Sequence, residues 1–157
     1  MVIVHLITGL PGSGKTTLAQ QIQRESGAVR MCPDDWMQLA GIPLFDERAR
    51  ALIEQHQWVL GLDLAARGRD IIVEWGTWGA NERTRIQREA TAKGHAVHAY
   101  FLDPPLAELW RRVDRRNQLL GEQDQVPYEE LARSSWLIEW PLATELADYA
   151  AVTSTRQ

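Results

Sequence analysis

Cysteine and long apolar runs are nearly absent from this sequence of 157 residues. Cys32 is the only cysteine, so no disulfide can form within the chain, as in proteins of reducing compartments. No segment approaches the roughly 18 apolar residues that a membrane-spanning helix needs, and the first residues lack a signal-peptide pattern. We therefore expect a cytoplasmic protein with no membrane partner.

Lysine is also scarce, and arginine carries most of the positive charge. Only Lys15 and Lys93 are lysines among the 17 basic residues, and 21 acidic residues give a formal net charge of -4. This balance gives no general attraction to nucleic acid, although it leaves a local basic groove possible. The four histidines lack the spacing of a metal site. The length of the chain favours a single domain over residues 1–157.

Short apolar segments alternate with longer segments of helical periodicity. The pattern predicts strands at 2–8, 28–32, 70–75, 95–102 and 149–153. It predicts helices at 16–25, 47–66, 81–93, 104–117 and 128–148, the last with a break near Pro141. Apolar residues at 49, 52, 53, 59, 60 and 64 indicate the second helix, and Asn81 is expected to cap the third. Such alternation is typical of an α/β fold with a mostly parallel sheet.

The segment after the first strand has the pattern of a phosphate-binding loop. It reads Gly9-Leu10-Pro11-Gly12-Ser13-Gly14-Lys15-Thr16-Thr17 and precedes a helix, which is the context that the motif requires. Backbone N–H groups and the positive end of the helix dipole attract phosphate oxygens, and side chains at Gly12 or Gly14 would obstruct them. Lys15 supplies a charge for the β- and γ-phosphates, and the Thr16 hydroxyl is placed to ligate Mg²⁺. The sequence therefore predicts binding of a nucleoside triphosphate with Mg²⁺.

Acidic residues follow the second strand and end the third. Asp34 and Asp35 stand where a carboxylate would face the terminal phosphate as a general base, and the alternative is that one of them caps a helix beginning near Trp36. Glu74 stands where an acid orients the water ligands of Mg²⁺, or else it is a capping or ion-pairing residue.

Four arginines lie in the segment 108–117. Arg112 and Arg116 are four residues apart and share a helical face, next to a polar stretch, so residues 112–127 are expected to form a lid over the phosphates. The alternative is a solvated basic face. Arg83 lies near the loop after the third strand and is a candidate for substrate contact.

Seven tryptophans are many for this length. Trp36, Trp75 and Trp78 follow strand ends on the expected ligand side, where they form either an aromatic wall for an acceptor or part of the core. Trp110 and Trp136 are expected in the core, and Cys32 is expected to be a buried residue and not a nucleophile.

Together these motifs resemble the small P-loop kinases, the AAA-type group that includes phage polynucleotide kinase, chloramphenicol phosphotransferase and zeta toxins. The resemblance rests on the phosphate loop, the Pro-Asp-Asp at 33–35, the acid at 74, the Glu-Arg at 82–83 and the Trp-Arg-Arg…Arg-Asn at 110–117. It implies a three-layer fold with sheet order 2-3-1-4-5. It also implies Asp34 as general base and Arg112 and Arg116 as lid arginines. Polynucleotide kinases carry an arginine three residues after the base, and here that residue is Met37.

This resemblance implies transfer of the γ-phosphate of ATP to a hydroxyl group. A small acceptor such as an antibiotic, sugar or nucleoside is favoured over a polynucleotide 5′-hydroxyl. Two other functions remain open at this point: a nucleotide-dependent switch that acts through a partner, and a toxin that phosphorylates a nucleotide-sugar. The sequence does not indicate the oligomeric state.

Overall fold

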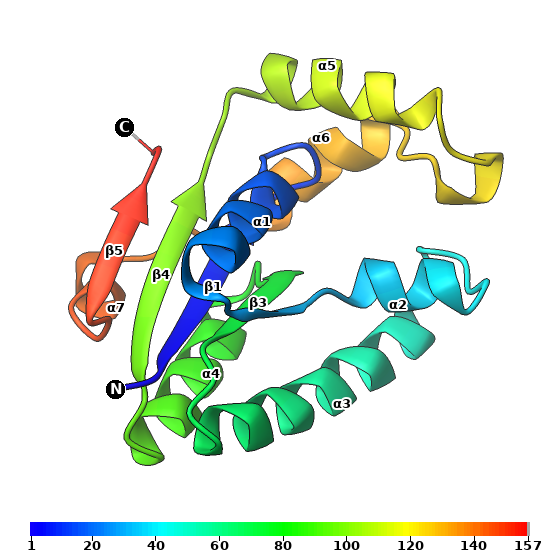
Figure 1. Ribbon diagram of the computed structural model, residues 1–157. Helices are drawn as coiled ribbons and strands as arrows, with labels where there is room; N and C mark the ends of the chain where they lie inside the picture. The colour runs from blue at the N-terminus through cyan, green and yellow to red at the C-terminus, as the bar shows by residue number, and fades with distance from the viewer. Residues whose placement is uncertain (157) are drawn as a thin grey trace.

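The computed structural model describes residues 1–156 and is built around a parallel sheet of five strands (Figure 1). The strands are β1 (Ile3–Gly9), β2 (Val29–Met31), β3 (Ile71–Gly76), β4 (Ala96–Leu102) and β5 (Ala151–Ser154). Their order across the sheet is β2-β3-β1-β4-β5, which confirms the expected topology. β1 is central and pairs in register with β4 from Ile3↔Ala96 to Gly9↔Leu102.

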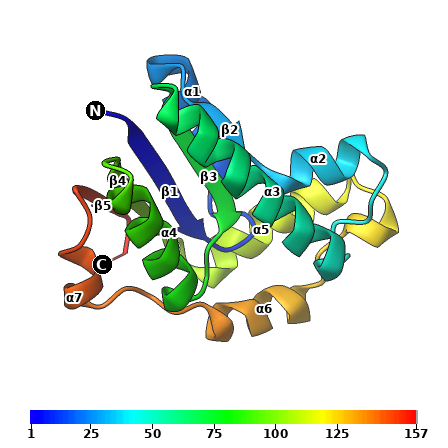
Figure 2. The ribbon, with the colours of Figure 1, turned by 90° about the horizontal axis from the view of Figure 1, so that it is seen from below.

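The helices cover both faces of this sheet and extend beyond one end of it. They are α1 (Lys15–Ser26), α2 (Pro33–Leu39), α3 (Glu47–Ala66), α4 (Ala80–Ala92), α5 (Leu106–Asn117), α6 (Tyr128–Leu137) and α7 (Ala143–Leu146), with a 3₁₀ turn η1 (Glu122–Asp124). Figure 2 shows α3 and α4 side by side along one face. α5 and α6 lie beyond the carboxyl ends of the strands (Figure 1). Within residues 1–156, no helix is long and apolar enough to cross a membrane.

Alternate residues of β1 enter two different cores, because successive side chains of a strand point to opposite faces. Val4 and Leu6 pack with Trp58 of α3 and Ile86 of α4. Ile7 packs on the other face with residues of α1. A third cluster joins Leu10 of the phosphate loop to α5 and α6. The loop at the carboxyl end of β1 is therefore anchored to the two helices beyond the sheet.

Helix α3 has the predicted bounds but presents a different face to the sheet. The buried positions are Gln57, Trp58, Gly61 and Ala65, whereas Leu52, Val59 and Leu60 are exposed. A Cβ at residue 61 would lie 3.0 Å from Ile71 Cδ1, so glycine allows the helix to approach β3 closely. The apolar positions in the sequence therefore identified the helix without identifying its inner face.

Three local predictions are wrong. Helix α2 begins at Pro33 and not near Trp36, so Asp34 and Asp35 lie in its first turn and neither is its N-cap. Gly79, and not Asn81, caps α4, and the Ala80 N–H donates to Glu139 Oε2 at 2.7 Å. Trp136 is 89% exposed. Two residues correspond to about 200° of helical rotation, which carries Trp136 away from the side of α6 that buries Ser134.

A buried ion pair attaches the C-terminal part of the chain to α4. The Arg83 side chain is fully buried and donates to both carboxylate oxygens of Glu145, at 2.6 and 3.0 Å. The Tyr149 hydroxyl donates to the same carboxylate at 2.8 Å. Removing one member of such a pair leaves an uncompensated buried charge.

Replacing Glu145 by Gln is therefore expected to lower the free energy of unfolding by about 3 kcal/mol, since Arg83 would keep its charge without a counter-ion. Urea unfolding followed by circular dichroism measures this. The control is Asp63→Asn, which breaks the exposed Asp63–Arg67 pair and should cost less than about 0.5 kcal/mol. Equal effects of the two substitutions would contradict the expectation.

Candidate functional site

A cavity of about 1140 Å³ lies at the carboxyl ends of the central strands. The phosphate loop forms one side of it, and α3, the loop after β3, and α6 contribute to the other. All four residues predicted to be catalytic line it, namely Lys15, Asp34, Arg112 and Arg116. Thr16 and Glu74, the two residues predicted for the metal, line it as well. The structure thus brings the predicted catalytic and metal residues to one place. Residues 11–17 of the predicted phosphate loop also line the cavity, whereas Gly9 and Leu10 do not.

The two inner glycines of the phosphate loop are needed for different reasons. Gly12 has φ 81°, and a Cβ there would lie 2.8 Å from the Leu109 carbonyl oxygen, so α5 packs directly on the loop. Gly14 has φ 96° and caps α1, but a Cβ there would meet only Arg112 Nη1, at 3.9 Å. Glycine at 14 therefore serves the left-handed backbone conformation, and glycine at 12 also makes room for α5.

The loop ends in polar groups that suit a phosphate. Ser13 Oγ is buried without a hydrogen-bond partner, and the first N–H groups of α1 have no intrahelical acceptor. Lys15 Nζ donates to the Leu10 carbonyl oxygen at 2.9 Å. Burial lowers the pKa of Lys15 to about 8, and the nearby carboxylates of Asp34 and Glu74 oppose this shift. An anion bound here would be met by unused donors and a poorly solvated ammonium group.

Glu74 connects three elements at the edge of the cavity. The Thr16 hydroxyl donates to its Oε1 at 2.5 Å, and Arg30 Nε on β2 donates to its Oε2 at 2.9 Å. Within residues 1–156, no group of three or more His, Cys, Asp or Glu side chains is arranged to hold a metal ion. A hydroxyl beside a carboxylate fits a Mg²⁺ ion whose other ligands are phosphate oxygens and water.

The adjacent acids Asp34 and Asp35 point to different partners. Asp34 lines the cavity and accepts a hydrogen bond from Arg50 Nη2 at 2.6 Å. Asp35 lies 3.4 Å from Arg30 Nη1, with 57% of its side chain exposed, and is not among the residues that line the cavity. Only the first acid of the pair therefore faces the phosphate loop.

Two of the arginines of α5, Arg112 and Arg116, line the cavity, whereas Arg111 does not. Arg112 Nη1 donates to the Gly12 carbonyl oxygen at 3.1 Å, so this side chain lies on the phosphate loop. Arg116 lines the cavity, and its charge contributes to the lowered pKa of Lys15. Glu108 accepts hydrogen bonds from Arg111 and Arg112, which lower the pKa of its carboxyl group to about 2. Arg112 and Arg116 thus share the cavity side of α5, as their spacing predicted.

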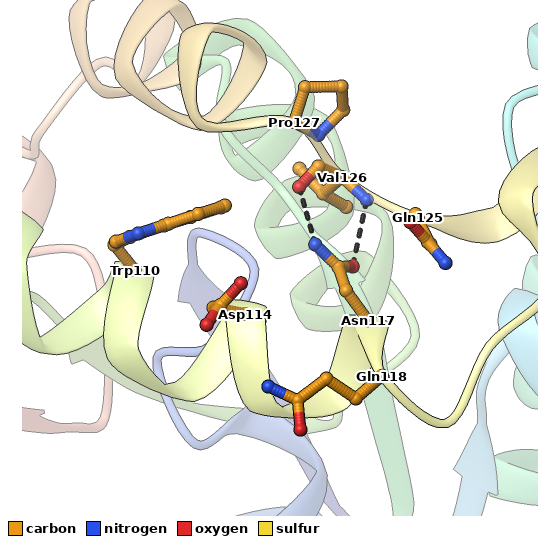
Figure 3. Close-up of a pocket in the computed structure, with 7 residues that line it drawn as sticks. All are labelled: Trp110, Asp114, Asn117, Gln118, Gln125, Val126 and Pro127. Atoms are coloured by element: carbon orange, nitrogen blue, oxygen red, sulfur yellow. Dashed lines mark hydrogen bonds between the residues drawn. The ribbon is translucent and has the colours of Figure 1, made fainter.

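The segment after α5 is held at both of its ends. Asn117 donates from Nδ2 to the Val126 carbonyl oxygen at 2.8 Å and accepts from the Val126 N–H at 3.0 Å (Figure 3). Trp110, Asp114 and Gln118 line a shallow pocket beside this double hydrogen bond (Figure 3). The polar stretch 118–125 is therefore a loop closed at its base, and it contains the short turn η1.

The loop after β3 is strained where it meets the carboxyl end of β1. Thr77 is buried with φ 43°, an unfavourable value for a β-branched residue, and its hydroxyl lies 2.6 Å from that of Thr8. Arg83 Nη1 donates to the carbonyl oxygens of Thr77 and Trp78. The expected substrate contact of Arg83 is wrong, because this buried side chain supports the loop from behind. Strain held by surrounding contacts is typical of functional sites.

Two of the three candidate tryptophans line the cavity. Trp75 and Trp78 do, and Trp78 Nε1 donates to the carbonyl oxygen of Gly9, the first residue of the phosphate loop, at 3.1 Å. Trp36 is 42% exposed and is not among the lining residues.

Cys32 is buried as predicted, and burial together with the charge of Glu74 raises its pKa to about 12, so the thiolate is disfavoured.

The contribution of α3 to the cavity was not predicted from the sequence. Glu47, Arg50 and Glu54 line the cavity from its first two turns. Their spacing of three and four residues places them on one helical face, and this face continues into the buried residues Gln57 and Trp58. In the sequence, the charged residues Glu47, Arg50 and Glu54 follow the same helical spacing as Gln57 and Trp58. This pattern was the available signal that the charged residues face inward.

Glu54 is the most perturbed acid of the cavity. Burial raises its pKa from the usual 4.5 to about 7, and the charges of Glu82 and Asp34 act in the same direction, while Arg50 opposes them. Burial also raises the pKa of Glu82. Perturbed acids in a cleft are typical of functional sites.

This shift makes the stability of the ligand-free protein depend on pH. Below pH 4.5 the Glu54 carboxyl is protonated in both states. As the pH rises towards 7, the unfolded chain ionises first, so folded stability is progressively lost. Glu54→Gln removes this loss and is expected to raise the melting temperature at pH 8 but not at pH 4.5, by about 2–4 °C for each kcal/mol relieved. Thermal melts at several pH values measure it, with the exposed Glu129→Gln as control, and equal pH profiles for the two variants would contradict it.

The sequence matches one known protein family. Residues 4–138, well over half of the chain, match the sequence profile of the AAA domain. No curated protein matches the sequence significantly.

Several solved structures have the same fold. Kti12 from Chaetomium thermophilum in complex with ADP-AlF3 has a TM-score of 0.69 at 16% identity, over 96% of this chain and 87% of that one. A sugar kinase from Janibacter sp. has a TM-score of 0.66 at 22% identity, over 100% and 87%. The Mycobacterium tuberculosis APS kinase CysC, solved with AMPPNP and APS, has a TM-score of 0.65 at 19% identity, over 99% and 90%. The chain therefore belongs to the AAA domain family, and its fold is that of the small P-loop kinases.

Proposed function

We propose that this protein is a kinase that transfers the γ-phosphate of ATP to a hydroxyl group of a small molecule. The observation that carries the proposal is that a carboxylate, Asp34, faces the same cavity as the phosphate-loop residues Lys15 and Thr16. A purely nucleotide-binding protein has no need of a base on the opposite side of the phosphates. Solved structures of the same fold include a sugar kinase and an APS kinase, which supports this reading.

In the proposed reaction the acceptor hydroxyl lies between Asp34 and the γ-phosphate. Its oxygen forms a bond to the γ-phosphorus as its proton passes to the Asp34 carboxylate, and the bond to the β–γ bridging oxygen breaks to release ADP. Lys15, Arg112 and Arg116 surround the phosphates with positive charge. Such groups stabilise charge on the transferring phosphoryl group without covalent participation.

Thr16 and Glu74 would hold the Mg²⁺ that accompanies the nucleotide. The Thr16 hydroxyl would exchange its hydrogen bond to Glu74 for the ion, and Glu74 would accept from the ion's water ligands. When bound, Mg²⁺ neutralises charge between the β- and γ-phosphates. Arg30 keeps the Glu74 carboxylate in place meanwhile.

The acceptor side of the cavity is acidic, which favours a small neutral or amine-bearing acceptor over a nucleic-acid end. Its lining acids are Asp34, Glu47, Glu54, Glu82, Asp124 and Glu130. Its two arginines already have acidic partners, since Arg50 pairs with Asp34 and Arg133 pairs with Glu130. Phosphates of a polynucleotide would find no unpaired cation among these residues.

Lys15→Met is expected to weaken ATP·Mg²⁺ binding by roughly 10- to 100-fold, because a charge-assisted contact to the phosphates is lost. Isothermal titration calorimetry measures it. Lys93→Met is the matched control, since this exposed lysine at the end of α4 is the only other one in the chain. A Lys15→Met protein that binds ATP as tightly as Lys93→Met would count against the predicted phosphate site.

Asp34→Asn is expected to lower phosphoryl transfer by about 10²- to 10⁴-fold while leaving ATP affinity nearly unchanged, since the base acts on the acceptor. The measurement is product mass after incubation with ATP·Mg²⁺ and a panel of nucleosides, sugars, aminoglycosides, chloramphenicol, nucleotide-sugars and 5′-hydroxyl oligonucleotides.

Asp35→Asn is the matched control for this experiment and should retain most of the activity, because Asp35 pairs with Arg30 outside the cavity. ATP turnover that is indifferent to every acceptor and to Asp34→Asn would instead favour a nucleotide-dependent switch. Transfer confined to oligonucleotides would show that the acceptor is a nucleic-acid end.

A further inference from the structure

The backbone N–H and carbonyl groups of Leu44, which lines the cavity, both form hydrogen bonds to side chains. Leu44 lies in the loop 40–46 between α2 and α3, and its N–H donates to Asp124 Oδ1 at 3.0 Å. Asp124 belongs to η1, in the loop that Asn117 closes at its base. The Leu44 carbonyl oxygen accepts a hydrogen bond from Arg50 Nη2 at 2.9 Å. A residue on the acceptor side thus connects η1 to a cavity-lining arginine.

The same nitrogen of Arg50 reaches Asp34. Arg50 Nη2 donates to Asp34 Oδ1 at 2.6 Å as well as to the Leu44 carbonyl oxygen. The chain of contacts therefore runs from Asp124 through Leu44 and Arg50 to Asp34. It joins η1, the loop 40–46, α3 and α2, which are distant in sequence.

Arg50 occupies only one of the two carboxylate oxygens of Asp34. Among the residues that the structure describes, no group hydrogen-bonds to Oδ2. With Oδ1 held, the rotation of the carboxylate is restricted, and Oδ2 remains the oxygen with capacity for a further hydrogen bond. A base must present one oxygen within hydrogen-bond reach of the proton that it takes.

The Arg50–Asp34 pair is too exposed to be explained by stability. The two side chains are 27% and 48% exposed, and pairs of this kind contribute at most about 1 kcal/mol. We therefore attribute the pair's role to the orientation that Arg50 gives to the Asp34 carboxylate. A planar guanidinium fixes direction better than a flexible ammonium group, which explains arginine at this position.

This arrangement also bears on the loss of the arginine at position 37. Met37 is fully buried and is not among the residues that line the cavity. The cation that reaches Asp34 comes from α3 instead of from α2 itself.

We propose that Arg50 is a positioning residue that orients Asp34 towards the acceptor, and that the Asp124–Leu44 hydrogen bond couples this orientation to the placement of the loop carrying η1. When that loop lies over the cavity, Leu44 is held and Arg50 keeps Asp34 in place. When it moves away, Leu44 loses the acceptor of its N–H. The base is then aligned only while the cavity is covered. This inference rests on the proposed kinase function.

The test compares Arg50→Met, Arg50→Lys, Asp124→Ala and the double variant Arg50→Met/Asp124→Ala. With the acceptor that the panel identifies, Arg50→Met should lower kcat by about 10- to 100-fold with little change in the KM for ATP, as misplacement of a reacting group does. Arg50→Lys should restore part of the loss. Asp124→Ala should lower kcat less, and the double variant should be no worse than Arg50→Met, since both act through one chain of contacts.

Hydrogen exchange of the segment 40–46 gives a readout that needs no acceptor. Asp124→Ala should speed exchange of the Leu44 amide roughly fivefold, as expected for one lost hydrogen bond, whereas Asp124→Asn keeps an acceptor oxygen and should not. Arg48→Met, an exposed arginine on the same helix, is the charge-matched control for Arg50→Met and should leave both kcat and exchange unchanged.

The possible failures are distinguishable. A panel without any phosphorylated acceptor overturns the proposed function, while the exchange result still decides the contact between η1 and Leu44. Unchanged kcat in Arg50→Met overturns the positioning role even though transfer is established. Additive losses in the double variant, or unchanged exchange in Asp124→Ala, overturn the coupling.

Discussion

The buried carboxylate of Glu74 is the interaction on which the arrangement of the site depends. It lies within β3, two residues before the strand ends at Gly76, and a buried charge must be compensated by nearby partners. Arg30 supplies the compensation from β2, and the Thr16 hydroxyl supplies a further hydrogen bond from α1. The sheet order places these partners within reach, because β3 lies between β2 and β1. The same constraint turns Asp35 towards Arg30 and leaves Asp34 facing the cavity.

Much of the fold could be predicted from the sequence, because its signals are local. The phosphate loop, the five strands and the break near Pro141 each occupy a short window in which residue types alone limit the backbone. The sheet order came from the family resemblance, and the structure confirms it. The grouping of Lys15, Thr16 and Glu74 then follows, since the carboxyl ends of neighbouring parallel strands meet at one edge of the sheet.

Apart from the starts of α2 and α4, the failed predictions concern which way a side chain points. Leu52, Val59 and Leu60 of α3 are exposed, whereas its inner side carries cavity-lining charges and Gly61, which allows close packing on β3. Arg83 was placed near the substrate by its position in the chain, yet Glu145, which is 62 residues away, draws it into the core. Arg50 was missed for the same reason, because its partners Asp34 and Leu44 are brought to it only by the tertiary fold.

The two backbone hydrogen bonds of Leu44 limit how the loop 40–46 can change in length. Surface loops between helices usually accept insertions and deletions with little effect. The loop 40–46 is different, because one added residue would shift either the N–H that meets η1 or the carbonyl that meets Arg50. The two hydrogen bonds of Leu44 therefore constrain the length of this loop, although its sequence contains no motif that would reveal this.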